Sequence, residues 1–114
     1  MTNDSDIAVE VLTERRRQDD RWGEQNHPDG TGPAVIVSGL PSLAGVARLD
    51  NLRTWATADC DRAAAHGSVT WTHILLEEVL EAVAEDDEVK LRAELIQVAA
   101  VAQQWVSAID RRAA

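Results

Sequence analysis

Five polar side chains in two short segments have the types and the spacing needed for metal chemistry. Glu77, Glu78 and Glu81 form the first segment and, after twelve intervening residues, Glu94 and Gln97 form the second. Side chains three or four positions apart share one face of a helix, so Glu78 points the same way as Glu81. A tight turn between the segments would make their helices antiparallel neighbours and bring Glu94 level with the first group.

Oxygen ligands on two facing helices suit a hard divalent cation such as Mg²⁺, with Mn²⁺ as an alternative. Zinc would favour His and Cys, which this cluster lacks. The two segments together offer three or four such oxygen ligands. Because Mg²⁺ commonly links protein carboxylates to substrate phosphates, a metal-loaded cluster would attract the phosphates that the bare cluster repels.

The alternative is a solvated acidic helix surface, since exposed helices are often rich in Glu. Residues 77–94 contain eight carboxylates against Lys90 and Arg92, which leaves a local net charge of −6. Such crowding is unfavourable unless solvent or a cation screens it. Glu94 lies in the most apolar helix of the chain, where an unpaired buried carboxylate would be costly. The spacing alone leaves both interpretations open.

The elements that position these residues are all helical. Gly and Pro residues divide the chain into four predicted helices, near residues 6–20, 42–66, 71–85 and 88–111, with a loop at 23–41. Ser68 or Thr70 is a suitable N-cap for the third helix. The run 34–37 is β-like but has no partner strand, so we expect a packed loop there.

The fourth helix carries an apolar stripe with heptad spacing. Its members are Leu91, Leu95, Val98, Ala102, Trp105 and Ile109. Further apolar residues lie on its other faces, so we expect its middle to be covered nearly all round. The pattern predicts an all-α, four-helix bundle-like domain over residues 1–114, and its apolar surface favours an oligomer over a monomer.

Composition sets the class of protein. The chain has 114 residues, 45% hydrophobic and 27% charged, which is typical of one globular domain. A net charge of −9 argues against binding to nucleic-acid polymers. The single Cys60 excludes an intrachain disulfide. With no signal-sequence pattern and no apolar run of membrane-spanning length, we expect a cytoplasmic protein without membrane association.

The carboxylate pattern resembles the signature of the MazG-like family of all-α nucleoside triphosphate pyrophosphohydrolases. That signature is Glu-Glu-x-x-Glu, a spacer, and then Glu-x-x-Asp. The first half is intact here at Glu77, Glu78 and Glu81, and the second begins at Glu94. Gln97 stands where the family usually has Asp. The match is best over residues 71–112, and the four-helix outline extends it more loosely to the whole chain.

The resemblance implies Mg²⁺-dependent hydrolysis of an NTP or dNTP to the monophosphate and pyrophosphate, by a homodimer or homotetramer. It implies that Glu78, Glu81 and Glu94 bind Mg²⁺ and are catalytic. Glu77, also catalytic, would contact a second metal ion or polarise the attacking water. Gln97 would take the fourth ligand position with a neutral carbonyl oxygen, a weaker ligand that puts full metal occupancy in doubt.

Substrate-binding candidates lie outside the acidic cluster. Trp22 and Gln25, in a segment that looks like phage and actinobacterial members of the family, could stack on a base and hydrogen-bond its edge. The alternative is that Trp22 is a core lid and Gln25 is solvated. Lys90 or Arg92 could neutralise phosphates, unless each is simply an exposed helix residue. His73, one turn before Glu77, is expected to pair with that carboxylate or to be exposed.

Two other functions stay open. Because Gln97 is neutral, the chain could be a non-enzymatic module that binds a nucleotide or a protein partner. It could also be a helical oligomerisation domain whose acidic residues serve only solubility. Pyrophosphate release, metal titration and ligand-dependent thermal stability separate the three.

Overall fold

The four predicted helices all form. The computed structural model describes residues 4–37, 39–40 and 46–112, and within these ranges the chain is all-α, with no strand. The helices are α1 (Asp4–Trp22), α2 (Leu49–Ala65), α3 (Trp71–Val83) and α4 (Glu88–Arg112). Within the same ranges, no helix combines the length and the apolar character needed to cross a bilayer.

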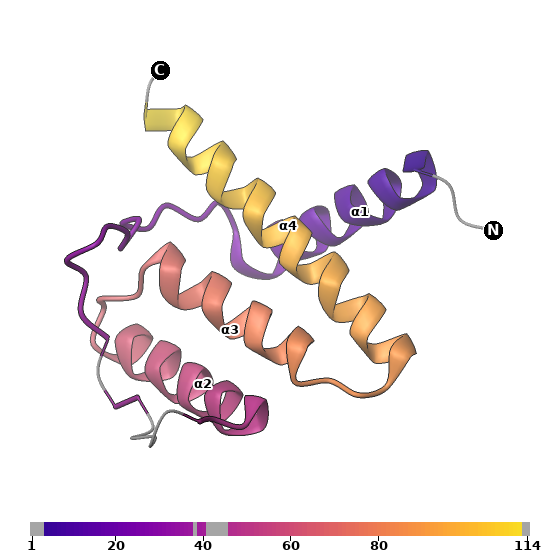
Figure 1. Cartoon of the computed structure of the whole chain (residues 1–114). Coiled ribbons are helices and arrows are strands. Elements are labelled where there is room, and N and C mark those ends of the chain that lie inside the picture. Colours follow the sequence, from indigo (N-terminus) through magenta and orange to yellow (C-terminus); the bar gives the residue numbers. More distant parts are fainter. Residues whose placement is uncertain (1–3, 38, 41–45, 113–114) are drawn as a thin grey trace.

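The helices pack in the spatial order α2, α3, α4 and α1. Helix α3 contacts both α2 and α4, and α1 packs against α4. Figure 1 shows α4 crossing in front of α1, and the connection between α1 and α2 running along the edge of the molecule. The α3–α4 turn occupies only residues 84–87, so these two helices fold back on each other as predicted.

Boundaries differ most at α2. The sequence predicts a helix near residues 42–66, but the helix begins at Leu49, and Val46 and Ala47 are exposed and non-helical. Positions 42–45 lie outside the described residues. Arg48 has an extended backbone at the N-cap, and its guanidinium donates two hydrogen bonds to the first-turn Asp50. This Arg48–Asp50 pair lies where α2 begins, later in the chain than predicted. Helical periodicity does not reveal such a local pair.

Helix α3 begins at Trp71 because Thr70 caps it. The Thr70 hydroxyl accepts a hydrogen bond from the backbone N–H of His73, and the His73 ring accepts one from the backbone N–H of Thr70. This reciprocal capping box satisfies two otherwise unpaired donors. His73 also lies 3.5 Å from a carboxylate oxygen of Asp59. The expectation that His73 pairs with Glu77 or is exposed is therefore wrong.

The core centres on the start of α3. Trp71 is 1% exposed and stacks on Trp105, with ring centroids 6.2 Å apart. Val101 and Ala108 complete this buried cluster. Large-to-small changes at such aromatic core positions cost about 3–5 kcal/mol. Trp71 is therefore a core residue, and Trp105 packs against it.

Helix α4 buries a different face from the predicted stripe. Its buried residues are Ala100, Val101, Gln104 and Ala108. Gln104 donates hydrogen bonds to the carbonyl oxygen of Arg15 and to the Asp19 carboxylate, and so fastens α4 to α1. Small residues on this face allow close approach of the neighbouring helices. The helix is apolar on both faces, so periodicity alone could not identify the inner one.

The predicted stripe is divided between the two faces of α4: Trp105 packs against the core, whereas Leu95 and Ile109 are exposed. Leu95 is 51% exposed and Ile109 is 44% exposed. The stripe is therefore not a seam within the described monomer, and the expectation of coverage all round fails on the exposed face.

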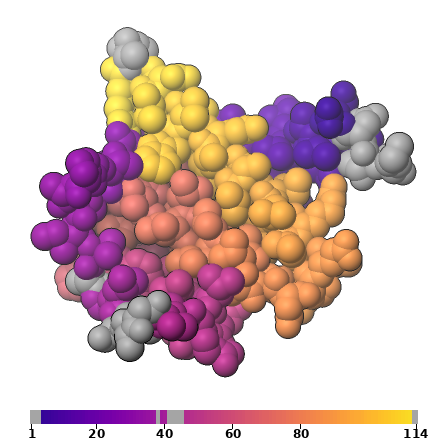
Figure 2. Space-filling model, in the orientation of Figure 1, coloured from indigo at the N-terminus to yellow at the C-terminus, as the bar shows by residue number. Residues whose placement is uncertain are grey.

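The run 34–37 forms neither helix nor strand, as expected, but Ile36 is 90% exposed. The expectation that this loop is packed is wrong, because Val35 and Val37 are exposed as well. Figure 2 shows this part of the connection on the surface, at the edge of the molecule.

Candidate functional site

Three carboxylates from two adjacent helices meet as the spacing predicts. Glu78 and Glu81 lie on α3 and Glu94 on α4, and one carboxylate oxygen from each lies within 4.8 Å of the others. All three residues are half-buried. The short turn at residues 84–87 aligns the two helices so that the second carboxylate segment faces the first.

Two oxygens of this trio are buried and lack partners. Glu78 Oε2 and Glu94 Oε2 have no hydrogen-bond partner among the described residues. A buried carboxylate oxygen without a partner is costly, and such groups in native proteins are normally satisfied by a donor, a water or an ion. The all-oxygen donor set therefore fits a hard divalent cation better than zinc.

The crowding of acidic groups alters their proton affinity. Burial raises the pKa of Glu78 to about 7, with further contributions from the charges of Glu81 and Glu94. Burial also raises the pKa of Glu81, and the charge of Glu94 adds to it. Arg53 on α2 acts in the opposite direction on Glu81. A divalent cation would offset this repulsion and favour the ionised forms.

Glu77 occupies the same turn of α3 but stands outside the trio. Burial, followed by the charges of Glu81 and Asp61, raises its pKa to about 7. Its carboxylate accepts a hydrogen bond from the thiol of Cys60 on α2. Burial is also the main reason that the pKa of Cys60 rises to about 12, so the thiol is protonated at neutral pH.

A cavity of about 530 Å³ adjoins the trio. Its size lies in the range of small-molecule sites. Its lining includes acidic Glu77 and Glu78 from α3, with Arg17 and Arg21 from α1. Gln97, the fourth predicted ligand, also lines it. The cavity thus places carboxylates that could hold a cation near arginines that could meet an anion.

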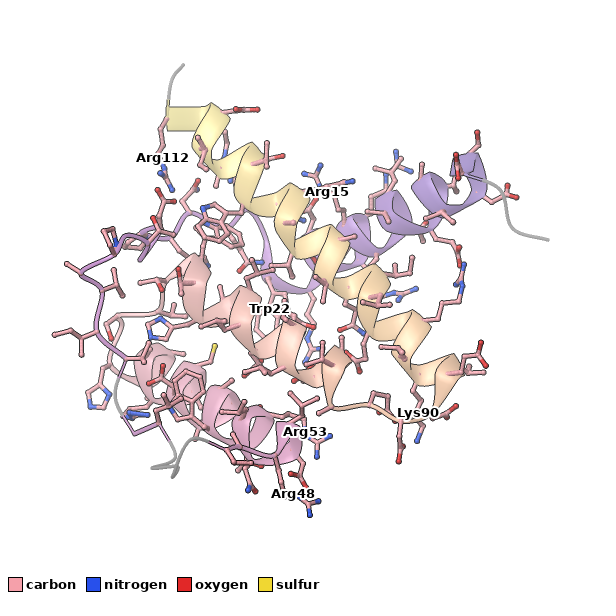
Figure 3. The ribbon with its side chains drawn as sticks, viewed as in Figure 1. Arg15, Trp22, Arg48, Arg53, Lys90 and Arg112 are labelled. Carbon is pink, nitrogen blue, oxygen red and sulfur yellow. The ribbon has the colours of Figure 1, made fainter. Side chains whose placement is uncertain are left out.

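Trp22 and Gln25, both predicted to bind substrate, line this cavity. Trp22 is 62% exposed, and the guanidinium of Arg21 lies 4.7 Å from its ring centroid. The alternative that Trp22 is a core lid is therefore wrong. Gln25 is half-buried rather than solvated, and its side-chain oxygen lies 3.0 Å from Nε2 of His27. Figure 3 labels Trp22 behind the α3–α4 pair.

The structure separates Lys90 and Arg92 from this cavity. Lys90 is exposed near the start of α4 and lines neither of the two described cavities (Figure 3). Arg92 forms an ion pair with Glu10 of α1 and lines a second cavity of about 290 Å³ beside Gln97. Their predicted contact with phosphates stays a prediction.

Sequence reasoning missed Glu14 and Arg53 as members of the site. Glu14 lines both cavities, its carboxylate is 12% exposed, and its charge contributes to the raised pKa of Glu78. It forms an ion pair with Arg17, at 2.6 Å. Glu14 on α1 and Arg53 on α2 reach the acidic cluster from helices that are distant from it in sequence. No local residue spacing indicates that they lie close to it.

Comparisons of the chain with protein-family models, curated proteins and solved structures found no match. The MazG-like resemblance therefore stays a prediction from the residues, and the function has to be argued from the geometry of the site.

Proposed function

We propose that the chain is a divalent-cation-dependent nucleotide pyrophosphohydrolase of the MazG-like type. It would cleave an NTP or dNTP between the α and β phosphates, giving a nucleoside monophosphate and pyrophosphate. The main support is the trio of Glu78, Glu81 and Glu94, whose oxygens converge and include two buried atoms without partners. Glu78 also lines the cavity, so a bound cation would lie beside a compartment of ligand size.

In this proposal Glu78, Glu81 and Glu94 hold Mg²⁺ or Mn²⁺, and Gln97, which lines the cavity, would add a neutral oxygen. When bound, the cation would neutralise phosphate charge and make a water molecule more acidic. Glu77 would accept the proton of the attacking water, because a carboxylate with a pKa of about 7 is a suitable general base at neutral pH. Water oxygen bonds to the α phosphorus as the bond to the bridging oxygen breaks.

The cavity lining suggests how the substrate would lie. Trp22 has an exposed ring on which a base could stack, and Gln25 could hydrogen-bond the edge of that base. Arg17 and Arg21, one helical turn apart on α1, are better placed than Lys90 to meet a phosphate chain inside the cavity.

We also propose that the chain forms a homodimer or homotetramer through the exposed face of α4. Leu95, Ala102, Val106 and Ile109 lie on this face, opposite the buried residues of the same helix. A contiguous exposed apolar face of this kind is typical of a protein–protein contact.

The direct test is a panel of NTPs and dNTPs with Mg²⁺ or Mn²⁺, with products identified by ion-exchange chromatography. We expect monophosphate and pyrophosphate from at least one nucleotide. Glu78→Gln and Glu94→Gln should each lower the rate at least about 100-fold, since each removes a charged metal ligand. The matched control is Glu88→Gln, the same chemical change at an exposed position of α4. Absence of turnover for the whole panel by folded protein would refute the proposal.

The second candidate function is a nucleotide-binding module without catalysis, and the neutral Gln97, which lines the same cavity as Glu78, favours it. Gln97→Asp distinguishes the two. If the parent binds a nucleotide in calorimetry without cleaving it and Gln97→Asp acquires turnover, the binding module is the correct description. If the parent already cleaves nucleotides, the hydrolase is the correct description.

A further inference from the structure

A loop on the rim of the candidate substrate cavity is tied to the last turn of α4. Arg112 donates two hydrogen bonds to the Asp29 carboxylate, at 2.9 and 2.8 Å, and a third to the carbonyl oxygen of His27. Arg111 bonds the carbonyl oxygen of Gln25 and pairs with Glu24. Figure 3 shows Arg112 extending from the end of α4 toward this loop, and Figure 2 shows the loop lying against that end.

The same loop is bound to the first turn of α3. The backbone N–H of Trp71 donates to the carbonyl oxygen of Pro28, at 3.0 Å. The backbone N–H and the hydroxyl of Thr72 both donate to the carbonyl oxygen of Asp29, at 3.1 and 2.9 Å. Gly30 follows with a φ of +68°, and a Cβ there would lie 2.5 Å from Oγ1 of Thr70. The loop therefore has little freedom to shift while these contacts hold.

A continuous chain of side chains connects Asp29 to the cavity. Trp105 donates its indole N–H to the Asp29 carboxylate at 2.8 Å and stacks on Trp71. His27 packs edge-on against Trp71, with ring centroids 5.0 Å apart. His27 in turn contacts the side-chain oxygen of Gln25, and both line the cavity. Asp29 itself is absent from that lining.

We propose that Asp29 is a positioning residue for the candidate substrate cavity: held by Arg112 and Trp105, it fixes the loop that presents Gln25 and His27 to the substrate. The inference rests on the proposed function and deepens it. It assigns control of nucleotide affinity to the C-terminal turn of α4, which is separate from the carboxylates assigned to metal binding and catalysis. Loss of the contacts of Asp29 with Arg112 and Trp105 should weaken substrate binding and leave the chemical step largely intact.

The test is steady-state kinetics of Asp29→Asn on the best nucleotide from the panel. Asn keeps the size of the side chain but removes the charge that pairs with Arg112. We expect KM to rise about tenfold, as for loss of one charged hydrogen-bonded contact, with kcat changed less than about twofold. The matched control is Asp50→Asn, which removes a similarly exposed carboxylate that accepts two hydrogen bonds from Arg48 and does not line the cavity.

Hydrogen exchange gives a readout that does not depend on activity. In Asp29→Asn the amides of Trp71 and Thr72, which donate to the loop, should exchange faster, while those in the middle of α2 should not. Arg112→Gln should reproduce both effects, and the effect of the double variant should be smaller than the sum of the two single effects, because both changes disrupt the same Arg112–Asp29 pair. Arg112→Gln also serves if Asp29→Asn fails to fold.

The outcomes are distinguishable. If the wild type cleaves nucleotides and both variants keep its KM, the positioning role of Asp29 is wrong and the hydrolase proposal stands. If kcat falls while KM is unchanged, the role is also wrong. If the wild type cleaves no nucleotide at all, the proposed function and this inference fail together.

Discussion

The burial of Glu78 has two opposing consequences for the protein. Its burial helps to shape the carboxylate trio, and the same burial raises its pKa to about 7. A group whose pKa is raised on folding binds a proton more tightly in the native state than in the unfolded chain. Without a cation, the ionised form of Glu78 therefore weakens the fold that a bound cation would stabilise.

Glu78→Gln should raise the melting temperature of the metal-free protein at pH 8 by a few degrees, because the glutamine cannot ionise. The same variant should lose nucleotide hydrolysis, an exchange of activity for stability common at functional sites. Calorimetry in EDTA measures the first effect. A melting temperature that falls at pH 8 would mean that the Glu78 carboxylate is not repelled by its neighbours.

The pH dependence of the wild type follows from the same groups. Glu77 and Glu78 have pKa values of about 7 in the folded chain and a usual value of 4.5. The native state therefore holds more protons than the unfolded state between these values, and stability in EDTA should decline as pH rises from about 4.5 to 7.

Saturating Mg²⁺ should reduce or reverse that decline, since it favours the ionised carboxylates. Thermal melts at half-unit pH steps, with and without Mg²⁺, test this. Identical profiles under the two conditions would argue against a cation at this site.

At the scale of elements, the α3–α4 hairpin was the most predictable part of the molecule. Helical spacing placed Glu78 beside Glu81, and a turn too short for any other path placed Glu94 opposite them. Glu14 and Arg53 could not be found in this way, because α1 and α2 reach the site through contacts between segments distant in sequence. The inner face of α4 was misassigned because small Ala residues pack inward while Leu95 and Ile109 stay exposed.

The exposed face of α4 gives the prediction that belongs to this scale. Leu95→Lys and Ile109→Lys should each shift the protein toward monomer in sedimentation equilibrium, with helicity unchanged, because each places a charge in the proposed apolar contact. Gln103→Lys, at an exposed position off this face, is the control. A wild type that is monomeric at all accessible concentrations would refute the proposed assembly.

At the scale of the whole molecule, the all-α class followed from composition and periodicity, whereas the cavity did not. Its lining draws on α1, the loop that carries Gln25, and the three later helices. No single segment encodes such a compartment; it results from packing α1 on α4 and from fastening the loop to both α3 and α4. Trp22 and Gln25 were predicted as substrate-binding residues from the chemistry of their side chains. The contacts of Asp29 with Arg112 and Trp105 could be found only from the three-dimensional structure.

The most direct test of the proposed cation site is anomalous scattering from a crystal soaked in Mn²⁺ with a non-hydrolysable nucleotide analogue. We predict a single strong peak, or a close pair, bonded to oxygens of Glu78, Glu81 and Glu94, with the phosphates of the analogue beside it. Crystals at saturating Mn²⁺ that show no peak between these carboxylates, with their side chains directed to solvent, would contradict the account.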